Sequence, residues 1–369
     1  MSQKTICLVY NTTKYLYLHR LSLLRALLEM GNKVYVIAPV DSYSVKVENE
    51  GAKIINIQID RKGMNLFREL ILCFNIYKAY REIKPHIVHH FTIKPIIYGS
   101  IIGQLLGTPS IVNSINGLGN FWNQRVWGKI IIIFLYKCAC YGKKVKCIFQ
   151  NSDDMNIFSS RSIISPDKSI VIESCGIDLD YFNSMKYQVK NISNTPFKFL
   201  FLSRMLFDKG LNELYLAALE LYKERKDFEV ILAGEIDVGN PLSAKQEWIE
   251  TISARKPIKW VGFVKDTPKL IFDADIIILP SYHEGFSQTL LEALAMGRPI
   301  ITTDVPGCRE LVNGNGYLVK PKDIKELKTA MQQVMLSKDK LSKMGQKSRK
   351  LAMKYDNVSI NARTISYYL

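Results

Sequence analysis

The chain has 369 residues, of which 47% are hydrophobic and 23% charged, so a disordered chain is excluded and two globular domains are favoured over one. The formal net charge of +16 favours acidic partners, such as nucleic acid, anionic lipid headgroups or phosphorylated small molecules. The seven cysteines are scattered without a CxxC pair, which argues against a disulfide framework or a zinc site and for a reducing cytoplasm.

The N-terminal half alternates short apolar strands with longer helices, a pattern typical of α/β proteins with parallel sheets. The first residues, MSQKTICLVYN, have no signal-peptide layout and predict a first strand. The pattern predicts helices at His19–Met30 and Leu66–Ile83. The predicted strands of this half are Ile6–Tyr10, Lys33–Ala38, Ile54–Ile57, Ile87–His90, Ser110–Ile115, Cys147–Gln150 and Ser169–Glu173.

Residues 95–124 carry no charged side chain, but Gly, Pro and Asn interrupt them, so they predict no transmembrane span. The apolar run Ile130–Tyr136 is too short to cross a bilayer. Basic residues and tryptophans surround this run. This composition fits a helix that lies on an anionic membrane surface, and it also fits a core helix with one solvent-exposed edge. The candidate membrane residues are Trp122, Trp127, Lys129, Lys143, Lys144 and Lys146.

A polar segment, KYQVKNISNTP at residues 186–196, has no apolar period and predicts an interdomain linker. The α/β pattern then restarts, with helices alone expected after residue 302. Two doubly wound, Rossmann-like domains, residues 1–185 and 197–356, are therefore expected to face a cleft, with ligands beyond the carboxyl ends of the strands. The predicted elements are strands Phe197–Ser203, Phe228–Ala233, Ile258–Val261, Ile276–Pro280 and Pro299–Thr302, and helices Gly210–Arg225, Thr267–Ala274 and Gln288–Met296.

The apolar strand Ile276–Pro280 precedes the loop SYHEGFS and an apolar helix, and this junction carries two glutamates. The start of a helix offers free N–H groups and a positive dipole end, which suit a phosphate or a sugar oxygen. If the segment is mostly helical, Glu284 and Glu292 lie ~12 Å apart, so they could hold the sugar and the ribose of a nucleotide-sugar. Alternatively, Glu284 is a solvated loop residue. Glu292 could equally pair with Arg298 or Arg309.

Two cations follow the strand Phe197–Ser203, where the sequence reads SRMLFDKG. Arg204 and Lys209 stand at a strand-to-helix turn, a position at which cations can neutralise a diphosphate. Such fixed charges stabilise most strongly the negative charge that develops on a departing nucleoside diphosphate. The same two residues could instead pair only with Asp208 or Glu213.

Together these segments resemble glycosyltransferase family 4, the retaining enzymes with the GT-B fold. The resemblance covers nearly the whole chain, and its C-terminal motifs are the specific ones. The matching segments are SRMLFDKG, VGFV, PSYHEGFSQTLLEALAMGRPIITTDVPGCRE, FQNSDDMNIF and SCGIDLDYF.

The resemblance implies a role for each motif residue. Glu284 would contact the donor sugar, Glu292 would bind the donor ribose, and Arg204 with Lys209 would hold the diphosphate. The C-terminal helix at residues 357–369 would pack back on the N-terminal domain. Further donor contacts are expected from the backbone of Gly285, Phe286, Ser287, Phe263 and Val264.

The N-terminal half departs from the family in its acceptor loop. Many members carry a histidine before a glycine there, whereas this loop reads SINGLGNFW, with Asn116 before Gly117. Retention needs no protein base if the acceptor hydroxyl attacks from the leaving-group face and the phosphate takes its proton. The half resembles bacterial members that extend polyprenyl-diphosphate-linked saccharides. The candidate acceptor residues are His90, Lys94, Asn116, Gly117 and Arg125, with Lys94 and Arg125 for the phosphates.

The sequence therefore predicts a retaining glycosyltransferase that moves a hexose or N-acetylhexosamine from a UDP-sugar to a lipid-linked saccharide. It is expected to work at the inner face of the cell membrane as a peripheral protein. No metal or cofactor is expected, and the Asp178–Asp180 DxD triplet is interpreted as part of a loop. The enzymatic alternative is a nucleotide-sugar epimerase of the same fold. Nucleic-acid binding is not expected, because no aromatic or basic constellation supports it.

Overall fold

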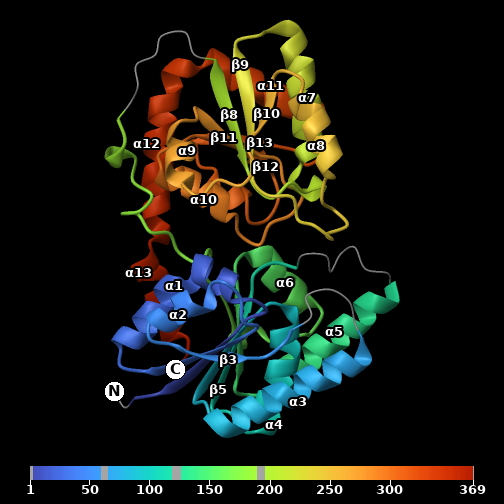
Figure 1. Cartoon of the computed structure of the whole chain (residues 1–369), viewed down its shortest axis with the longest axis vertical. Coiled ribbons are helices and arrows are strands. Elements are labelled where there is room, and N and C mark those ends of the chain that lie inside the picture. Colours follow the sequence, from blue (N-terminus) through green and yellow to red (C-terminus); the bar gives the residue numbers. More distant parts are fainter. Residues whose placement is uncertain (1–2, 60–64, 119–125, 189–195, 369) are drawn as a thin grey trace. The chain divides into compact units, whose positions relative to one another are not determined.

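The structure is a computed structural model that describes residues 3–59, 65–118, 126–188 and 196–368. The chain forms two compact units, shown in Figure 1. Unit 1 comprises Met1–Gly176 together with Asn357–Leu369, and unit 2 comprises Ile177–Asp356. The predicted linker at residues 186–196 falls largely on residues 189–195, which lie outside the described residues.

Unit 1 is built on a seven-stranded sheet in the order β3-β2-β1-β4-β5-β6-β7, with every described pair parallel. Its central strands read as apolar runs because helices cover both faces of a parallel sheet. The strands are β1 Thr5–Val9, β2 Lys33–Ala38, β3 Lys53–Asn56, β4 Ile87–Phe91, β5 Ser110–Ile115, β6 Val145–Phe149 and β7 Ser169–Val171.

Side-chain caps set where the unit 1 helices begin. The Thr12 side chain accepts from Lys14 N, so α1 begins six residues before its predicted start. Asn65 caps α3, which ends at Lys84 in the left-handed region, directly before Pro85. The helices are α1 Thr13–Glu29, α2 Ser44–Asn49, α3 Leu66–Ile83, the π-helix η1 Pro95–Gly99, α4 Ser100–Leu105, α5 Val126–Cys140, α6 Ser152–Ser160, η3 Pro166–Lys168 and α13 Asn357–Ser366.

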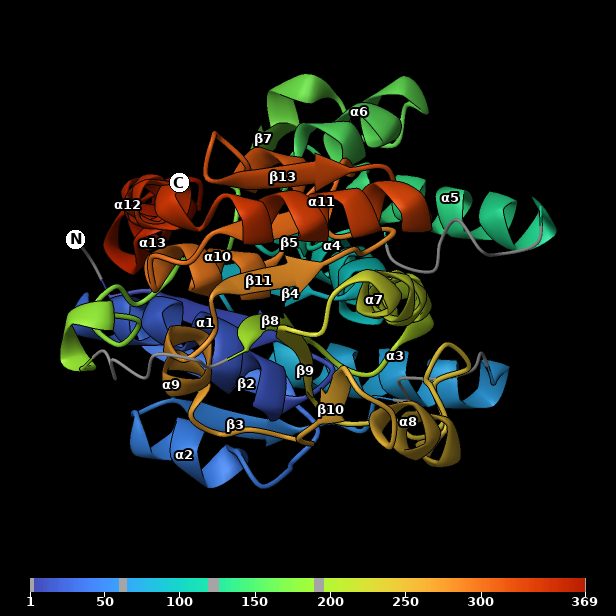
Figure 2. The same ribbon diagram turned by 90° about the horizontal axis from the view of Figure 1, so that it is seen from above.

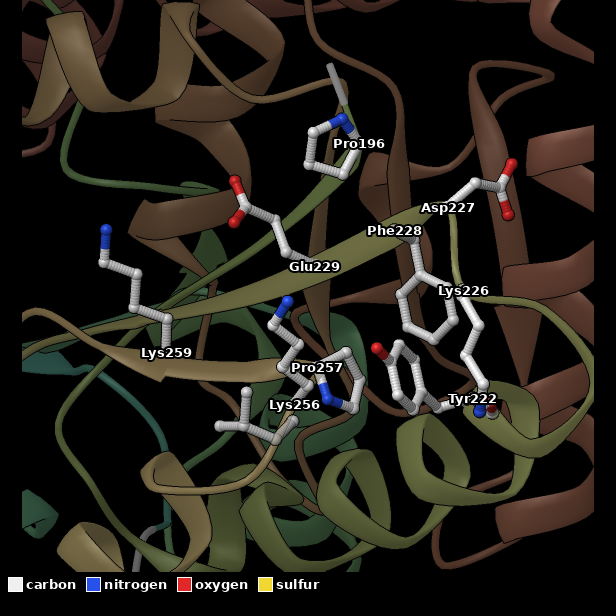
Figure 3. Close-up of a pocket in the computed structure, with 10 residues that line it drawn as sticks. Pro196, Tyr222, Lys226, Asp227, Phe228, Glu229, Lys256, Pro257 and Lys259 are labelled. Carbon is white, nitrogen blue, oxygen red and sulfur yellow. Dashed lines mark hydrogen bonds between the residues drawn. The ribbon is translucent and has the colours of Figure 1, made fainter. Parts of the chain in front are cut away.

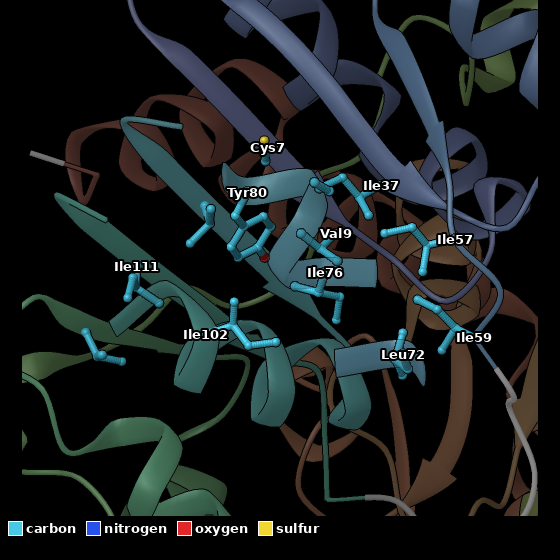
Figure 4. Packing of buried hydrophobic residues seen from close by; sticks show 13 residues of the cluster. Cys7, Val9, Ile37, Ile57, Ile59, Leu72, Ile76, Tyr80, Ile102 and Ile111 are labelled. Carbon is cyan, nitrogen blue, oxygen red and sulfur yellow. The ribbon is translucent and has the colours of Figure 1, made fainter. Parts of the chain in front are cut away.

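The core of unit 1 fills the space between its sheet and the inner faces of α3 and α4 (Figure 4). Leu72, Ile76 and Tyr80 of α3 pack there against Val9 and Val88 of the central strands. The final helix, α13, contacts α1 and so belongs to the same unit, although it follows all of unit 2 in the sequence.

Unit 2 repeats the architecture with a six-stranded parallel sheet in the order β10-β9-β8-β11-β12-β13. The strands are β8 Phe197–Leu202, β9 Phe228–Ala233, β10 Ile258–Trp260, β11 Ile276–Leu279, β12 Ile300–Thr303 and β13 Gly316–Val319. The helices are η4 Ser184–Lys186, η5 Phe207–Lys209, α7 Leu211–Glu224, α8 Gln246–Ser253, α9 Thr267–Phe272, α10 Gln288–Ala295, η6 Arg309–Leu311, α11 Ile324–Leu336, η7 Lys338–Lys340, α12 Leu341–Ala352 and η8 Met353–Tyr355. Figure 2 shows α11 running beside β13.

Two features of unit 2 differ from the sequence-based expectation. The edge strand β13 lies in a region predicted to hold only helices, because a four-residue strand after glycines gives no clear period. The first unit ends at Gly176 rather than at residue 185. Ile177 N donates to Tyr355 O at 2.9 Å, and the Arg349 guanidinium of α12 donates to Phe182 O at 2.7 Å, so this segment is held by unit 2.

Candidate active site

The predicted donor residues of unit 2 collect at one edge of its sheet. Arg204 and Lys209 follow β8, and Glu284 follows β11, the strand hydrogen-bonded to β8. The strand order reverses between β8 and β11, because the next strand in the chain after β8 lies on its other side. Ligands of doubly wound sheets bind beyond the carboxyl ends of the strands at such a reversal.

Glu284 and Lys209 form an ion pair across this reversal. Lys209 Nζ donates to Glu284 Oε1 at 2.8 Å, and each side chain keeps only 15% of its surface exposed. Glu284 is therefore not a freely solvated loop residue, and Lys209 does not pair with Asp208 or Glu213. The other carboxylate oxygen, Glu284 Oε2, bonds no other described residue, so it can accept a hydrogen bond from a ligand hydroxyl.

Arg204 is held by a partner that sequence reasoning missed. Its Nη1 donates to Asp237 Oδ2 at 2.6 Å, and Asn240 Nδ2 donates to the same oxygen at 2.9 Å. Asp237 comes shortly after β9, the strand that flanks β8 on the side opposite to β11. Its position after a strand end was the one sequence feature that could have pointed to it. The Arg204 side chain stays 40% exposed, which leaves further N–H groups of its planar fork for a ligand.

Glu292 has no counter-charge. It lies in α10, and no hydrogen bond or ion pair joins its carboxylate to another described residue. Arg298 donates instead to Phe272 O at 2.6 Å, and Arg309 pairs with Asp304 at 2.7 Å, so neither predicted alternative partner holds it. Desolvation raises the pKa of Glu292 to about 8. A carboxyl group in this state is costly to ionise without a ligand that donates hydrogen bonds to it.

This raised pKa predicts that Glu292→Gln stabilises the protein more at high pH than at low pH. The folded pKa of about 8 lies above the ordinary value of 4.5, so the native state binds more protons than the unfolded state between these values. The contribution of protonated Glu292 to the free energy of unfolding is therefore fully present below pH 4.5 and is lost as the pH rises to about 8. We expect the gain at pH 9 to be about 2 kcal/mol, discounted for partial exposure. Denaturant titrations at pH 5 and pH 9 measure it, and an equal effect at both would contradict the assignment.

The loop between β11 and α10 is not helical, so the ~12 Å separation expected for a helical segment does not apply. Ser287 caps α10, and its own N–H donates to Gly307 O at 2.8 Å. The prediction that the Ser287 N–H contacts a donor sugar is therefore wrong, because that proton is already bonded. Phe286 is buried against Tyr355, with ring centroids 5.1 Å apart, while its N–H has no partner among the described residues. Gly285 lies beside it, buried at the turn.

Two glycines allow the loops of this edge to touch. A Cβ on Gly210, whose φ is +75°, would lie 2.1 Å from Pro280 O, where the loop after β8 meets the end of β11. A Cβ on Gly307, with φ +79°, would lie 2.6 Å from Gly285 O and 2.7 Å from Glu284 O. Larger residues at either position would displace the backbone that carries Lys209 or Glu284.

The VGFV segment follows β10 at the same edge of the sheet. Gly262 O accepts from Gly234 N at 2.8 Å, which ties this loop to the end of β9. Phe263 is 66% exposed, and no backbone hydrogen bond of Phe263 or Val264 to another described residue is formed. An exposed ring with unbonded backbone groups can stack on a base and bond its edge.

In unit 1, His90 is inaccessible to an acceptor because it lies in the core. His90 is fully buried, and its Nε2 lies 2.7 Å from Tyr80 Oη while its Nδ1 lies 2.8 Å from Asn113 Oδ1. Burial lowers the pKa of His90 to about 4, so the ring is neutral at pH 7. The residue packs in the core because its side chain lies on a filled face of the sheet, between Tyr80 of α3 and Asn113 of β5. The assignment of His90 to acceptor binding is therefore wrong.

The other candidate acceptor residues are arranged differently. Lys94 forms an ion pair with Glu69, a buried residue of α3, so its charge is already compensated. Asn116 is exposed directly after β5, and Gly117 has a φ of +109°, a value that favours glycine. Arg125 lies outside the described residues.

The candidate membrane lysines, which the structure describes, are spread over three segments. Lys129 lies at the start of α5, whereas Lys143 and Lys144 are exposed directly before β6, beyond the other end of that helix. Lys146 is a strand residue whose Nζ donates to Tyr367 O at 3.2 Å. Trp122 lies outside the described residues, and Trp127 is described only as part of the α5 backbone.

A hollow lies at the opposite edge of the unit 2 sheet, where β9 and β10 begin (Figure 3). Its lysines stand among acidic residues, so it has no uniform charge. The lining residues are Pro196, Tyr222, Lys226, Asp227, Phe228, Glu229, Lys256, Pro257, Ile258 and Lys259. Within the described ranges, no group of three or more His, Cys, Asp or Glu side chains could hold a metal ion.

Two family models match the chain in succession. The model "Glycosyl transferase 4-like" matches residues 5–152, and the model "Glycosyl transferases group 1" matches residues 185–351. The second match contains Arg204, Lys209 and Glu284 at the edge of the unit 2 sheet, and Glu292 of α10.

Named relatives and a solved structure agree with these matches. The chain is 27% identical to a Campylobacter jejuni N,N'-diacetylbacillosaminyl-diphospho-undecaprenol alpha-1,3-N-acetylgalactosaminyltransferase, over 96% of this chain and 95% of that one. It is 25% identical to an Escherichia coli UDP-Gal:alpha-D-GlcNAc-diphosphoundecaprenol alpha-1,3-galactosyltransferase, over 74% and 72%. The fold is that of Anabaena HepE, solved with UDP-glucose, at a TM-score of 0.80 and 18% identity over 99% and 100% of the two chains. The chain therefore belongs to the family 4 glycosyltransferases, the group 1 glycosyl transferases with the GT-B fold.

Proposed function

We propose that this glycosyltransferase moves a hexose or N-acetylhexosamine, with retention, from a UDP-sugar to a polyprenyl-diphosphate-linked saccharide. The observation that carries the donor half is the grouping of Arg204, Lys209 and Glu284 where the strand order of unit 2 reverses. The acceptor half is supported by the names of the two relatives, both of which act on undecaprenyl-linked sugars.

Arg204 and Lys209 would hold the donor diphosphate. As the bond between the sugar C1 and the phosphate oxygen breaks, negative charge grows on that oxygen, and the two cations stabilise it. The acceptor hydroxyl forms the new C1–O bond from the same face, and its proton passes to the departing phosphate oxygen. Glu284 Oε2 would accept from a donor-sugar hydroxyl, while Glu292 would accept from the ribose. Asn116 and Gly117 of unit 1 are the acceptor contacts that this proposal retains.

The proposal includes no metal ion, because the two cations supply the neutralising charge. Transfer should therefore persist in a chelator. We further propose that the protein works at the anionic inner face of the cell membrane, where a lipid-linked acceptor resides. In the described part of the chain, no helix is both long enough and apolar enough to span a bilayer.

The test is incubation with radiolabelled UDP-sugars and a bacterial lipid extract. Label that moves into the lipid phase supports transfer, and an α-linkage in the product supports retention. Epimerised UDP-sugar that stays in the water phase would instead support an epimerase. That alternative gains no support from the comparisons, since both relatives named above are transferases.

Gly307→Ala should lower transfer without unfolding the protein. The added methyl group would lie 2.6 Å from Gly285 O and 2.7 Å from Glu284 O, so the loop that carries Glu284 must shift. A displacement of this kind near reacting atoms costs on the order of 100-fold in turnover. Gly31→Ala is the matched control, since it has a similar φ of +78° but nothing within 4 Å of the added atom. Equal turnover of the two variants would contradict the role of this close approach.

A further inference from the structure

Helix α3 carries an apolar face that no other described residue covers. Leu66, Phe67 and Phe74 are 76%, 73% and 66% exposed, although large apolar side chains are normally buried. Leu70, Ile71 and Tyr77 lie on the same side of the helix, as their spacing of three and four residues requires. The opposite side packs into the core of unit 1 (Figure 4). A helix with apolar side chains on both sides is normally covered on both sides, so the exposed side of α3 lacks a partner among the described residues.

Exposed apolar side chains also occur on two neighbouring helices. Both α3 and α5 contact α4 and η1, so the three helices cover the same side of the sheet, and Figure 1 shows α3 and α5 running in the same direction. On α5, Ile130, Ile131 and Phe134 are exposed, and on α4, Leu105 is exposed. We call this set the α3–α5 surface. Its members are Leu66, Phe67, Leu70, Ile71, Phe74, Tyr77, Leu105, Ile130, Ile131 and Phe134.

Basic residues border the α3–α5 surface. Lys78 and Arg81 are exposed at the end of the α3 stripe, and the Arg81 guanidinium lies 5.9 Å from the centre of the Tyr77 ring. Lys137 is exposed on α5, where no acidic residue occurs. Of the two acidic residues on α3, Glu69 is buried against Lys94, so only Glu82 offsets these charges at the surface.

We propose that the α3–α5 surface inserts its apolar side chains into the interfacial region of an anionic lipid bilayer. This proposal rests on the proposed function, in which the acceptor is held by a membrane. Large apolar side chains beside lysine and arginine are the composition of helices that lie in the plane of a membrane, where the cations reach anionic headgroups. A two-fold contact between copies of this chain would instead pair the same surface of both copies, and so bring two borders of like positive charge together.

The α3–α5 surface differs from the basic cluster that the sequence pointed to. Lys143 and Lys144 precede β6, and Lys146 is bonded to Tyr367 O. Electrostatic attraction alone is weakened by salt, whereas inserted apolar side chains hold a protein on the bilayer at physiological ionic strength.

The test is sedimentation of the full chain with mixed phosphatidylethanolamine–phosphatidylglycerol vesicles at physiological salt. The double variant Phe67→Ser, Phe74→Ser replaces two inserted rings by serine. It should bind the vesicles about tenfold or more weakly than the wild type. Leu336→Ser is the matched control, because Leu336 is 71% exposed on α11 of unit 2 and should leave binding unchanged. All three replaced side chains are exposed, so circular dichroism melts should coincide with those of the wild type.

Undiminished sedimentation of the double variant would overturn the proposal. So would a wild-type dimer in sedimentation equilibrium that the same two substitutions convert to monomers, because a second copy would then cover the surface. The vesicles contain no saccharide and no donor is added, so these results do not depend on the proposed reaction. Failure of the proposed function would appear separately, as a wild-type protein that binds vesicles but transfers no sugar.

Discussion

Glu284→Gln is expected to lower the turnover of sugar transfer about 100-fold to 1,000-fold while changing UDP affinity much less. The structure shows Glu284 Oε1 bonded to Lys209 Nζ at 2.8 Å, with the second oxygen free of described partners. Glutamine keeps the size of the side chain but removes the negative charge. That charge pairs with Lys209 and strengthens the hydrogen bond that the carboxylate would accept from a donor-sugar hydroxyl. UDP lacks that sugar, so its binding should depend mainly on the cations and on Glu292.

Single-turnover rates with the UDP-sugar, together with calorimetric binding of UDP, separate these two effects. Glu224→Gln is the matched control, because Glu224 also forms an ion pair with a lysine of unit 2, Lys328, but at the C-terminal end of α7, the opposite end of that helix from Lys209. Turnover unchanged in Glu284→Gln, or a loss of similar size in Glu224→Gln, would contradict the role assigned to Glu284.

Arg204→Gln is expected to lower kcat/KM about 100-fold and, unlike Glu284→Gln, to weaken UDP binding as well. The guanidinium is held by Asp237 at 2.6 Å and remains 40% exposed, so it can bond the diphosphate in the ground state and in the transition state. Lysine should not rescue the loss, because an ammonium group cannot donate to Asp237 and to a phosphate through one planar fork.

Arg225→Gln controls for the loss of a paired arginine. Arg225 forms a two-pronged pair with Asp227, at 2.8 and 2.7 Å, at the opposite edge of the same sheet. Its removal should leave kcat/KM and UDP affinity unchanged. Full activity of Arg204→Lys would show that a point charge suffices and would contradict the need for a planar guanidinium group at this position.

Much of the fold could be read from the sequence because parallel strands buried on both faces leave continuous apolar runs. Strands β2, β5 and β9 and helix α3 have the bounds that the pattern predicts. The pattern failed where a local cap or a short edge strand decided the structure. Thr12 started α1 early, and β13 has only four residues, Gly316–Val319, too few to show a period.

The site residues divide in the same way. Arg204, Lys209 and Glu284 could be found from the sequence because each lies in the turn between an apolar strand and the next helix, and a strand end fixes which edge of the sheet that turn occupies. Asp237 could not be assigned, since its role depends on a hydrogen bond across two loops. His90 was misassigned, because the last residues of a strand point alternately to either face and the sequence does not show which face is filled.

The sequence by itself determined the family, the two α/β halves and the edge of the sheet that carries the donor residues, because these follow from apolar periods and from motifs next to strand ends. Only the tertiary structure decided which charges are paired. Glu284 is bonded to Lys209 and Arg204 to Asp237, whereas Glu292 stays without a counter-ion. It also showed that α3 exposes its apolar face, which a helical period alone cannot reveal, since exposure depends on which neighbours fold against each side.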